Sequence, residues 1–278
     1  MRLKIRHQTS YRFDASASAV IQTLRLTPRS FDGQHILRWR LDVDRNCRLR
    51  PVEDAFGNLT HVFAADGPIE ELTVLVEGEV DTQDANGVIR GAVERFPPGL
   101  YLRETPLTAP DPDIGAYARA VSEESGGDVL NRLHGLMAAL NEDMIFEEGA
   151  TEVTATAAEA FRLKRGVCQD LTHVFLVAAR HLGVPARYIS GYFHRNDGVQ
   201  KQRAGHAWAE AHVPGLGWVG FDPANCICPT DAHVRVAVGL DYLGAAPVRG
   251  SRYGGGGETL DVQVSVEAAA DDVRAYRR

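Results

Sequence analysis

The spacing of hydrophobic residues changes near residue 100 of this chain, and this change constrains the fold more than any other feature. Before the change, apolar and polar residues alternate in the segments 3–13, 37–43 and 72–76. This two-residue period is typical of half-buried β-strands. Turn signals such as Asp32-Gly33 and Asn86-Gly87 separate the segments. Residues 1–100 therefore predict an antiparallel, sandwich-like β domain.

A proline-rich stretch at residues 96–113 follows the β segments, and we interpret it as a linker. The apolar residues after it have the spacing of one helix face, as seen at Leu133, Leu136, Met137 and Leu140. Residues 168–182 are apolar almost all round. That pattern predicts a helix buried on all sides, at the centre of the second half of the chain.

Strand-like segments follow this helix at 186–193, 206–213, 218–222 and 260–266. Strand segments on both sides of the helical part of the chain, without a regular strand–helix alternation, are typical of an α+β fold. We divide the chain into an N-terminal β domain (1–100), a core (101–255) and a C-terminal strand and tail (256–278). The last strand can pair with either the β domain or the core, and the glycine run 254–257 predicts a surface loop.

Composition argues against two classes of protein. The 278 residues include 30 Lys+Arg and 37 Asp+Glu, for a net charge of -7, whereas nucleic-acid binders have a basic footprint. No apolar run reaches the roughly 18 residues of a membrane span, and no signal-peptide core follows Met1. The four cysteines then predict a cytoplasmic protein with reduced thiols.

Cys168 is the first candidate for chemistry, because it lies where the apolar helix begins. Unpaired backbone N–H groups and the positive end of the helix dipole gather at such a position. Both stabilise a thiolate, and the same N–H groups can stabilise the oxyanion that forms when a thiolate attacks a carbonyl. A buried structural cysteine is the alternative, and position alone leaves both open.

His206 and Asp222 are the candidates for a base and its orienting acid. His206 starts an expected strand, and a rigid strand suits a histidine that must accept a proton from a thiol. Asp222 ends the next strand and could accept the imidazole N–H, which would fix the tautomer. The alternatives are a structural or exposed histidine and an ordinary Asp-Pro turn before Pro223.

Strand register tests this pairing. Opposed residues in an antiparallel hairpin point to the same face, so His206 and Asp222 share a face only if opposed residue numbers have an even sum. A four-residue loop after Val213 gives an odd sum, whereas a three-residue loop or a bulge gives an even one. We predict the even register, with Asp222 opposite Trp208 and His206 as its diagonal neighbour.

The sequence also resembles a known family at these residues. The runs GVCQDLTHVFLVAARHLGVPARYISGYF and GHAWAEAHVPGLGWVGFDPAN, with HVRVAVGLDY after them, are similar to bacterial transglutaminase-like proteins of the papain-like superfamily. Those proteins are often described as cysteine proteases. The order Cys168, His206, Asp222 matches, as does a β domain before the core. The resemblance implies a papain-like transglutaminase core, in which a central catalytic helix packs on an antiparallel sheet.

By this resemblance the chain is a thiol hydrolase that cleaves peptide or amide bonds through a Cys168–His206–Asp222 triad and a thioester. A transglutaminase or another acyltransferase shares the first half-reaction, so the triad does not choose between them. A non-catalytic peptide-binding scaffold is the third alternative, although a scaffold does not need all three residues. The expected partner is a peptide or protein substrate, and we expect neither nucleic acid nor a membrane as a partner. The sequence leaves open whether the chain forms a homo-oligomer.

The resemblance leaves substrate contacts and the second oxyanion donor undefined. Animal transglutaminases use a tryptophan before the cysteine for this purpose, but the only one before Cys168 is Trp39, in the β domain. The backbone N–H of Cys168 is one donor, and the adjacent Gln169 is a candidate contact to substrate. Trp208 could line the cleft or fill the core, and Tyr188 could reach substrate or pack.

Metal binding has only a weak signal. Cys226-Ile-Cys228 lies near His212 and His233, but zinc sites usually carry two ligand pairs at C-x-x-C spacing. Structural or incidental thiols explain these cysteines better. No acidic loop has the pattern of a calcium site. We therefore expect neither a metal nor another cofactor.

Overall fold

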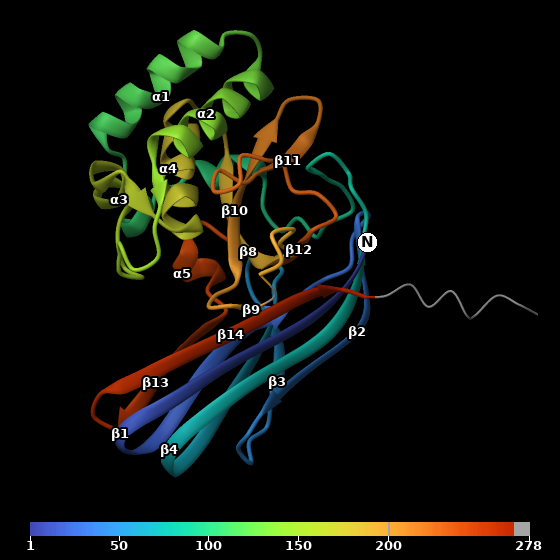
Figure 1. Ribbon diagram of the computed structural model, residues 1–278, viewed down its shortest axis with the longest axis vertical. Coiled ribbons are helices and arrows are strands. Elements are labelled where there is room, and N and C mark those ends of the chain that lie inside the picture. The colour runs from blue at the N-terminus through green and yellow to red at the C-terminus, as the bar shows by residue number, and fades with distance from the viewer. Residues whose placement is uncertain (200, 270–278) are drawn as a thin grey trace, which may run out of the picture.

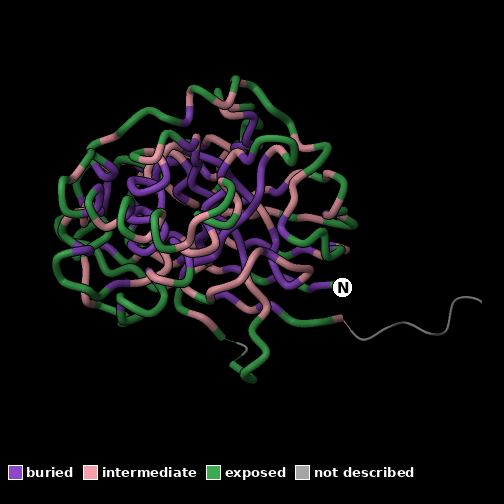
Figure 2. Tube along the Cα trace, turned by 90° about the horizontal axis from the view of Figure 1, so that it is seen from above, coloured by how far each residue is buried: buried purple, intermediate pink, exposed green. Residues whose placement is uncertain are grey.

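The computed structural model describes residues 1–199 and 201–269, which form a large β-sheet at one end and a helix-covered core at the other (Figure 1). The α+β class is therefore confirmed. Residues 270–278 of the predicted C-terminal tail lie outside the described residues. Figure 2 shows that buried residues concentrate in the middle of the molecule.

The large sheet is antiparallel. Its strands are β1 (Arg2–Thr27), β2 (Gln34–Val43), β3 (Arg50–Glu53), β4 (Leu59–Thr82), β9 (Lys201–Gln202), β13 (Val248–Gly254) and β14 (Glu258–Ala268). The order is β2-β4-β1-β14-β9, with β13 also on β1 and β3 on β4. The alternation expected at residues 3–13 is confirmed, since Leu3 and Ile5 are buried and their neighbours Arg2, Lys4 and Arg6 are exposed.

The two longest strands bend, so the large sheet doubles back on itself. The register between β1 and β4 shifts between Arg12 and Ala17. The connection between β13 and β14 lies next to this shift, because β13 pairs with β1 up to Ala17 and β14 pairs with it from Phe13. Figure 1 shows β1 and β4 turning there, beside that connection. One buried cluster draws on both halves of the strands: Phe13, Ala17, Val20, Leu24, Phe63, Leu72 and Val76. The sandwich-like form thus comes from bent strands within one sheet.

β13 and β14 pair with successive parts of β1 and so join the large sheet, one on each side of the expected boundary at residue 255. β13 places Val248 opposite Leu24, and β14 places Ala268 opposite Leu3. The glycine run 254–257 connects the two strands, next to the bend in β1. Local alternation showed a strand at 260–266, but it carried no information on which sheet the strand would join.

The core combines a second antiparallel sheet with helices. The sheet has the order β12-β8-β10-β11-β5 and consists of β5 (Val88–Ile89), β8 (Ala186–Phe193), β10 (His206–Val213), β11 (Gly217–Phe221) and β12 (His233–Gly239). The helices are α1 (Pro112–Ser125), α2 (Val129–Asp143), α3 (Ala157–Leu163), α4 (Cys168–His181) and α5 (Tyr242–Ala245). A short parallel pair, β6 (Ile145–Phe146) and β7 (Arg165–Gly166), lies beside α3 and α4. Among the described residues, no helix has the length and apolar character needed to cross a bilayer.

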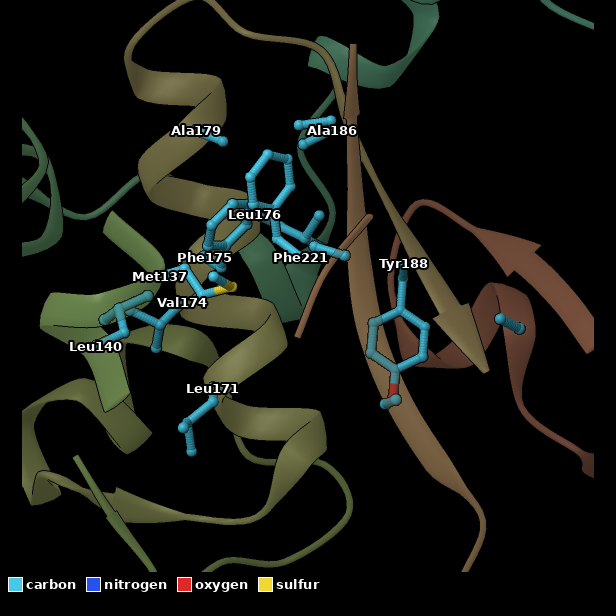
Figure 3. Packing of buried hydrophobic residues seen from close by; sticks show 14 of the residues in the cluster. Met137, Leu140, Leu171, Val174, Phe175, Leu176, Ala179, Ala186, Tyr188 and Phe221 are labelled. Atoms are coloured by element: carbon cyan, nitrogen blue, oxygen red, sulfur yellow. The ribbon is translucent and has the colours of Figure 1, made fainter. Parts of the chain in front are cut away.

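Helix α4 is central and buried, as the sequence predicted. Its residues 170–179 are all buried between the core sheet and the other helices. Figure 3 shows Phe175 of α4 close to Phe221 of β11, and their ring centres are 5.4 Å apart. Each fully buried side chain of this size contributes about 1.5–3 kcal/mol. The helix is therefore held rigidly, and Cys168 at its start is held with it.

The proline-rich stretch packs against the core, which corrects its interpretation as a linker. It contains the short 3-10 helices η1 (Pro98–Leu102) and η2 (Pro106–Thr108), and Tyr101 and Thr108 are buried. The guanidinium of Arg180 on α4 donates to Tyr101 O at 3.0 Å and to Thr108 Oγ1 at 2.8 Å. Proline composition indicated an irregular segment, but these contacts come from residues more than 70 positions away.

Candidate active site

Cys168 is the first residue of α4, and its neighbours fix the start of that helix. The Val167 N–H donates to Asp170 Oδ2 at 2.8 Å, and the Thr151 hydroxyl donates to the same oxygen at 2.7 Å. A Cβ on Gly166 would lie 2.6 Å from Asp170 Cβ, so glycine allows this close approach. Burial raises the pKa of Asp170, and the two hydrogen bonds counter that effect. Asp170 therefore serves as a cap, and the Cys168 side chain faces the cleft.

The hairpin of β10 and β11 has the register that a shared face requires. Ala209 opposes Phe221 and Val213 opposes Gly217, so opposed residue numbers have an even sum. The loop is the three-residue segment 214–216 rather than a bulge. The register prediction is confirmed, and it directs Asp222, just after β11, to the face that carries His206.

His206 and Asp222 form a short hydrogen bond, with 2.6 Å between Nε2 and Oδ2. The side chain of His206 is 10% exposed and that of Asp222 is fully buried. Burial alone would lower the pKa of His206, but the charge and hydrogen bond of Asp222, with a contribution from Cys168, raise it to about 10. Burial would raise the pKa of Asp222, yet His206 and His233 hold it well below its usual range. An imidazolium–carboxylate pair at neutral pH follows.

Asp222 accepts hydrogen bonds on both of its oxygens. Oδ1 accepts the backbone N–H of Ala224 at 3.1 Å and that of Asn225 at 3.3 Å. Oδ2 accepts Asn225 Nδ2 at 2.7 Å and lies 3.2 Å from His233 Nε2, in addition to its bond to His206. A carboxylate with this many donors is ionised and fixed in orientation. The Asp-Pro turn and the bond to histidine, which the sequence left as alternatives, therefore occur together.

The thiol of Cys168 completes the arrangement. It lines the same cleft as His206, and its interaction with that histidine is one of the causes that raise the pKa of His206. Because Nε2 of His206 is bound to Asp222, Nδ1 is the nitrogen left for the thiol. The three predicted residues thus form a continuous series of a thiol, an imidazole and a buried carboxylate, which is the arrangement that activates a nucleophile.

The same histidine could in principle belong to a metal site, because one potential ligand atom from each of His206, Asp222 and His233 lies within 4.8 Å of the others. The hydrogen bonds do not fit a metal. His233 Nδ1 accepts the Thr230 N–H at 3.1 Å, so the proton of a neutral ring is on Nε2, which then cannot ligate. His206 Nε2 is likewise engaged with Asp222 at 2.6 Å. The donor set suits proton-sharing groups.

A cleft of about 680 Å³ opens above the thiol and the imidazole. One wall comes from β6 and the segment after it, with Phe146 and Glu148. The opposite wall comes from the end of β8 and the segment before β10, including Val199 and Arg203. Phe146 and Val199 are 49% and 45% exposed, so each wall presents an apolar side chain to solvent.

The three residues expected to contact substrate do not line the cleft. Gln169 is turned away, and its Nε2 donates to Val153 O at 2.9 Å. Trp208 is 1% exposed and packs behind His206, with 6.0 Å between ring centres. Tyr188 is also buried, and burial raises its pKa well above the usual value, with the Cys168 charge adding to the effect. The last two therefore support the site from behind.

The other cysteines show no sign of a metal site. All four thiols are free, and within the described residues neither Cys226 nor Cys228 belongs to a group of three or more potential ligands. Burial and the nearby Asp84 raise the pKa of Cys228. His212, the other histidine considered for zinc, packs its ring against Trp218 at 5.3 Å.

Two residues that contact Asp222 were not predicted from the sequence to do so. Asn225 follows Asp222 by three positions, a spacing typical of a side chain that folds back on a turn. His233 begins β12 and reaches Asp222 from a different strand. The motif that starts at His233 was noted for its family resemblance, but spacing alone gives no reason to join it to Asp222.

Comparison with known proteins identifies the family. Residues 3–81 match the family described as bacterial transglutaminase-like N-terminal region, and residues 116–223 match the transglutaminase-like superfamily. The uncharacterized protein ML0607 of Mycobacterium leprae is 30% identical over 97% of this chain and 99% of its own length. The chain belongs to the bacterial transglutaminase-like family. The resemblance drawn from the sequence motifs is thereby confirmed.

Another relative and a solved structure are also similar to this chain. The uncharacterized protein Rv2569c of Mycobacterium tuberculosis is 26% identical over 95% of this chain and 92% of its own. A Cytophaga hutchinsonii structure, described as that of a candidate cysteine protease, covers 100% of this chain and 94% of its own, with 19% identity and a TM-score of 0.79. That likeness concerns the fold. The papain-like α+β core behind a strand-rich N-terminal region is confirmed.

Proposed function

We propose that this family member is a thiol hydrolase that cleaves peptide or amide bonds through Cys168, His206 and Asp222. One observation carries the proposal: a cysteine at the N-terminus of a buried helix lines the same cleft as a histidine whose Nε2 is 2.6 Å from a fully buried carboxylate. A peptide-binding scaffold gains nothing from a buried charge, because burying an ionised group is costly. A nucleophile–base pair needs it.

In the first half-reaction, the Cys168 thiolate attacks the carbonyl carbon and the carbonyl oxygen becomes an oxyanion. The N–H groups at the start of α4 stabilise this charge, with Cys168 N–H in first place. The His206 imidazolium then gives its Nδ1 proton to the amide nitrogen. The C–N bond breaks, an amine leaves, and a thioester to Cys168 remains.

In the second half-reaction, neutral His206 takes a proton from water, and the oxygen of that water attacks the thioester. The C–S bond breaks, the acid product leaves, and the thiolate–imidazolium pair is restored. Asp222 stays ionised throughout and keeps Nδ1 of His206 directed at the reacting atoms. We propose hydrolysis rather than amine transfer because the cleft beside Cys168 is open to solvent, with Phe146 and Val199 about half exposed, so water has direct access to the thioester.

The experiment is incubation of the purified chain with a peptide library, with and without an added primary amine. Cleavage without incorporation of the amine is expected. Cys168→Ala should abolish it, whereas Cys47→Ala, a matched loss of a thiol in the large-sheet region, should not. Amine incorporation would replace the proposal with a transglutaminase.

Labelling with low iodoacetamide at pH 6 gives an independent readout that needs no substrate. Cys168 should react first, since it begins α4 and lies beside the His206 imidazolium, whereas burial and Asp44 raise the pKa of Cys47. Equal, slow labelling of all four cysteines would favour the peptide-binding scaffold.

Partner and location follow as parts of the same proposal. The partner is a peptide or protein chain rather than nucleic acid or membrane, consistent with the net charge of -7 and the extended cleft. The compartment is a reducing one such as the cytoplasm, consistent with four free thiols. A thiol-redox titration of the protein from its native host would test that location.

A further inference from the structure

His233 is the one side chain at the triad that comes from β12, on the far side of β8 from His206. It is 5% exposed, and its Nε2 lies 3.2 Å from the Asp222 oxygen that also receives His206. The ring is enclosed by aromatic neighbours, with centres 4.6 Å from Phe193 and 5.3 Å from Trp208. It therefore has little freedom to turn.

The hydrogen bonds of His233 fix its tautomer. Nδ1 accepts the backbone N–H of Thr230 at 3.1 Å, so this nitrogen carries no proton. In a neutral ring the proton must then be on Nε2, and Nε2 can only donate to Asp222. Both ends of the imidazole are thus assigned by geometry, and the Thr230 N–H sets the direction of the bond to Asp222.

We propose that His233 is a positioning residue of the active site: a neutral imidazole of fixed tautomer that donates to Asp222 and holds this carboxylate on His206. The inference rests on the proposed function of Cys168. His233 does not touch the reacting atoms and acts only through Asp222.

The charged groups around the pair agree with this division of roles. The Asp222 carboxylate faces both rings, the Cys168 thiol faces His206 from α4, and Asp231 lies near His233. Burial lowers the pKa of His233, and Asp222 only partly offsets this, whereas Asp222 raises the pKa of His206 to about 10. One carboxylate therefore holds one cation, on His206, and one neutral donor, on His233.

Two substitutions of similar polarity separate positioning from simple packing. His233→Gln places an amide N–H near the position of Nε2 and can still donate to Asp222. His233→Asn places its amide near the position of Nδ1, so it can accept from Thr230 but does not reach Asp222. His212→Gln, at a histidine that packs on Trp218, is the control for loss of an imidazole from the core sheet.

The readout is the rate of Cys168 alkylation by iodoacetamide from pH 5 to 11, with thermal unfolding measured in parallel. We expect His233→Asn to slow alkylation at pH 6 by roughly tenfold to 100-fold, since a hydrogen bond to a charged group is lost. Its upper pH limb, which reports the loss of the His206 proton, should move down by about one pH unit. His233→Gln should remain within about threefold of the wild type.

The outcomes are distinguishable. An unchanged pH profile in His233→Asn, or a larger loss in His233→Gln than in His233→Asn, would assign His233 to packing and overturn the inference. A wild-type protein whose Cys168 reacts no faster than Cys47 would instead overturn the proposed function, before any His233 variant is compared.

Discussion

The large sheet and the core sheet both carry directly opposed Arg–Glu pairs, but at opposite depths. Arg12 and Glu71 face each other on β1 and β4, 2.9 Å apart, with side chains 77% and 59% exposed. Arg187 and Glu210 face each other on β8 and β10, 2.7 Å apart, with side chains 1% and 0% exposed. The same local chemistry therefore has two different physical contexts.

The depth of such a pair therefore decides its role: an exposed pair keeps the sheet surface polar, whereas a buried pair fixes the geometry of its surroundings. An exposed cross-strand pair gains little, about 0–1 kcal/mol, and mainly keeps the sheet surface polar. A buried pair costs several kcal/mol of desolvation per ion and is stable only with all its partners. Glu210 has them, since it also accepts Arg235 Nε at 2.7 Å. Among the residues that the structure describes, the buried Asp, Glu and Arg side chains all belong to the core, which also holds His206, and a fixed polar framework is useful there.

The strongest test of this contrast is Glu210→Gln. The substitution leaves Arg187 and Arg235 without their shared carboxylate in the interior of the core. We expect the free energy of unfolding to fall by about 3–5 kcal/mol, the usual cost of breaking a buried ion pair. Urea unfolding followed by circular dichroism measures the change.

Glu71→Gln is the matched control on the large sheet. Its loss should not exceed about 1 kcal/mol, because water replaces the lost partner of Arg12. Equal losses in the two variants would show that depth does not govern these pairs.

Asp222→Asn sharpens the comparison at the active site itself. The amide keeps the shape of the side chain but removes the charge that raises the pKa of His206. We expect the alkylation rate of Cys168 at pH 6 to fall roughly 10- to 1,000-fold, in proportion to a shift of 1–3 pH units in that histidine. Quenched-time-point mass spectrometry of Cys168 gives the rate.

Asp231→Asn is the control, since Asp231 is near His233 but is 35% exposed and pairs with the N-terminal amine. It should change the rate less than about threefold. If Asp222→Asn also left the rate unchanged, the buried carboxylate would have no part in activating the thiol.

The buried histidines should produce opposite pH dependences of stability. Burial lowers the pKa of His7 and of His173 to about 4, so both are neutral in the folded chain. Their contribution is present above pH 6.5 and is lost as pH falls through 4. The pKa of His206 is raised to about 10, so its contribution is complete below pH 6.5 and is lost as pH rises through 10.

We expect each group to change the free energy of unfolding by about 3–5 kcal/mol over its own full range. Urea unfolding at pH 4.5, 6.5 and 9.5 measures both effects. His7→Gln, at the contact between β1 and Tyr192, should weaken the acid loss alone, and Asp222→Asn should weaken the alkaline loss alone. A profile that neither variant alters would show that other groups govern the pH dependence.

The sequence by itself determined those features that depend on near neighbours. Helix start at Cys168 follows from an apolar run after a glycine and a polar first turn. The even register of the hairpin was predicted from the condition that His206 and Asp222 share a face, and the three-residue loop confirms it. Burial of one face of β1 follows from simple alternation. Family motifs supplied the link among Cys168, His206 and Asp222 that local physics did not.

Only the tertiary structure decided what meets across distant positions. It placed β14 on β1 rather than on the core sheet, turned Gln169 toward Val153, and buried Trp208 and Tyr188 behind the site. It also brought His233 to Asp222 from another strand. Hydrophobic period specifies which side of a strand is buried but not the partner it is buried against, because burial is non-directional and hydrogen bonds form only once packing has set the geometry.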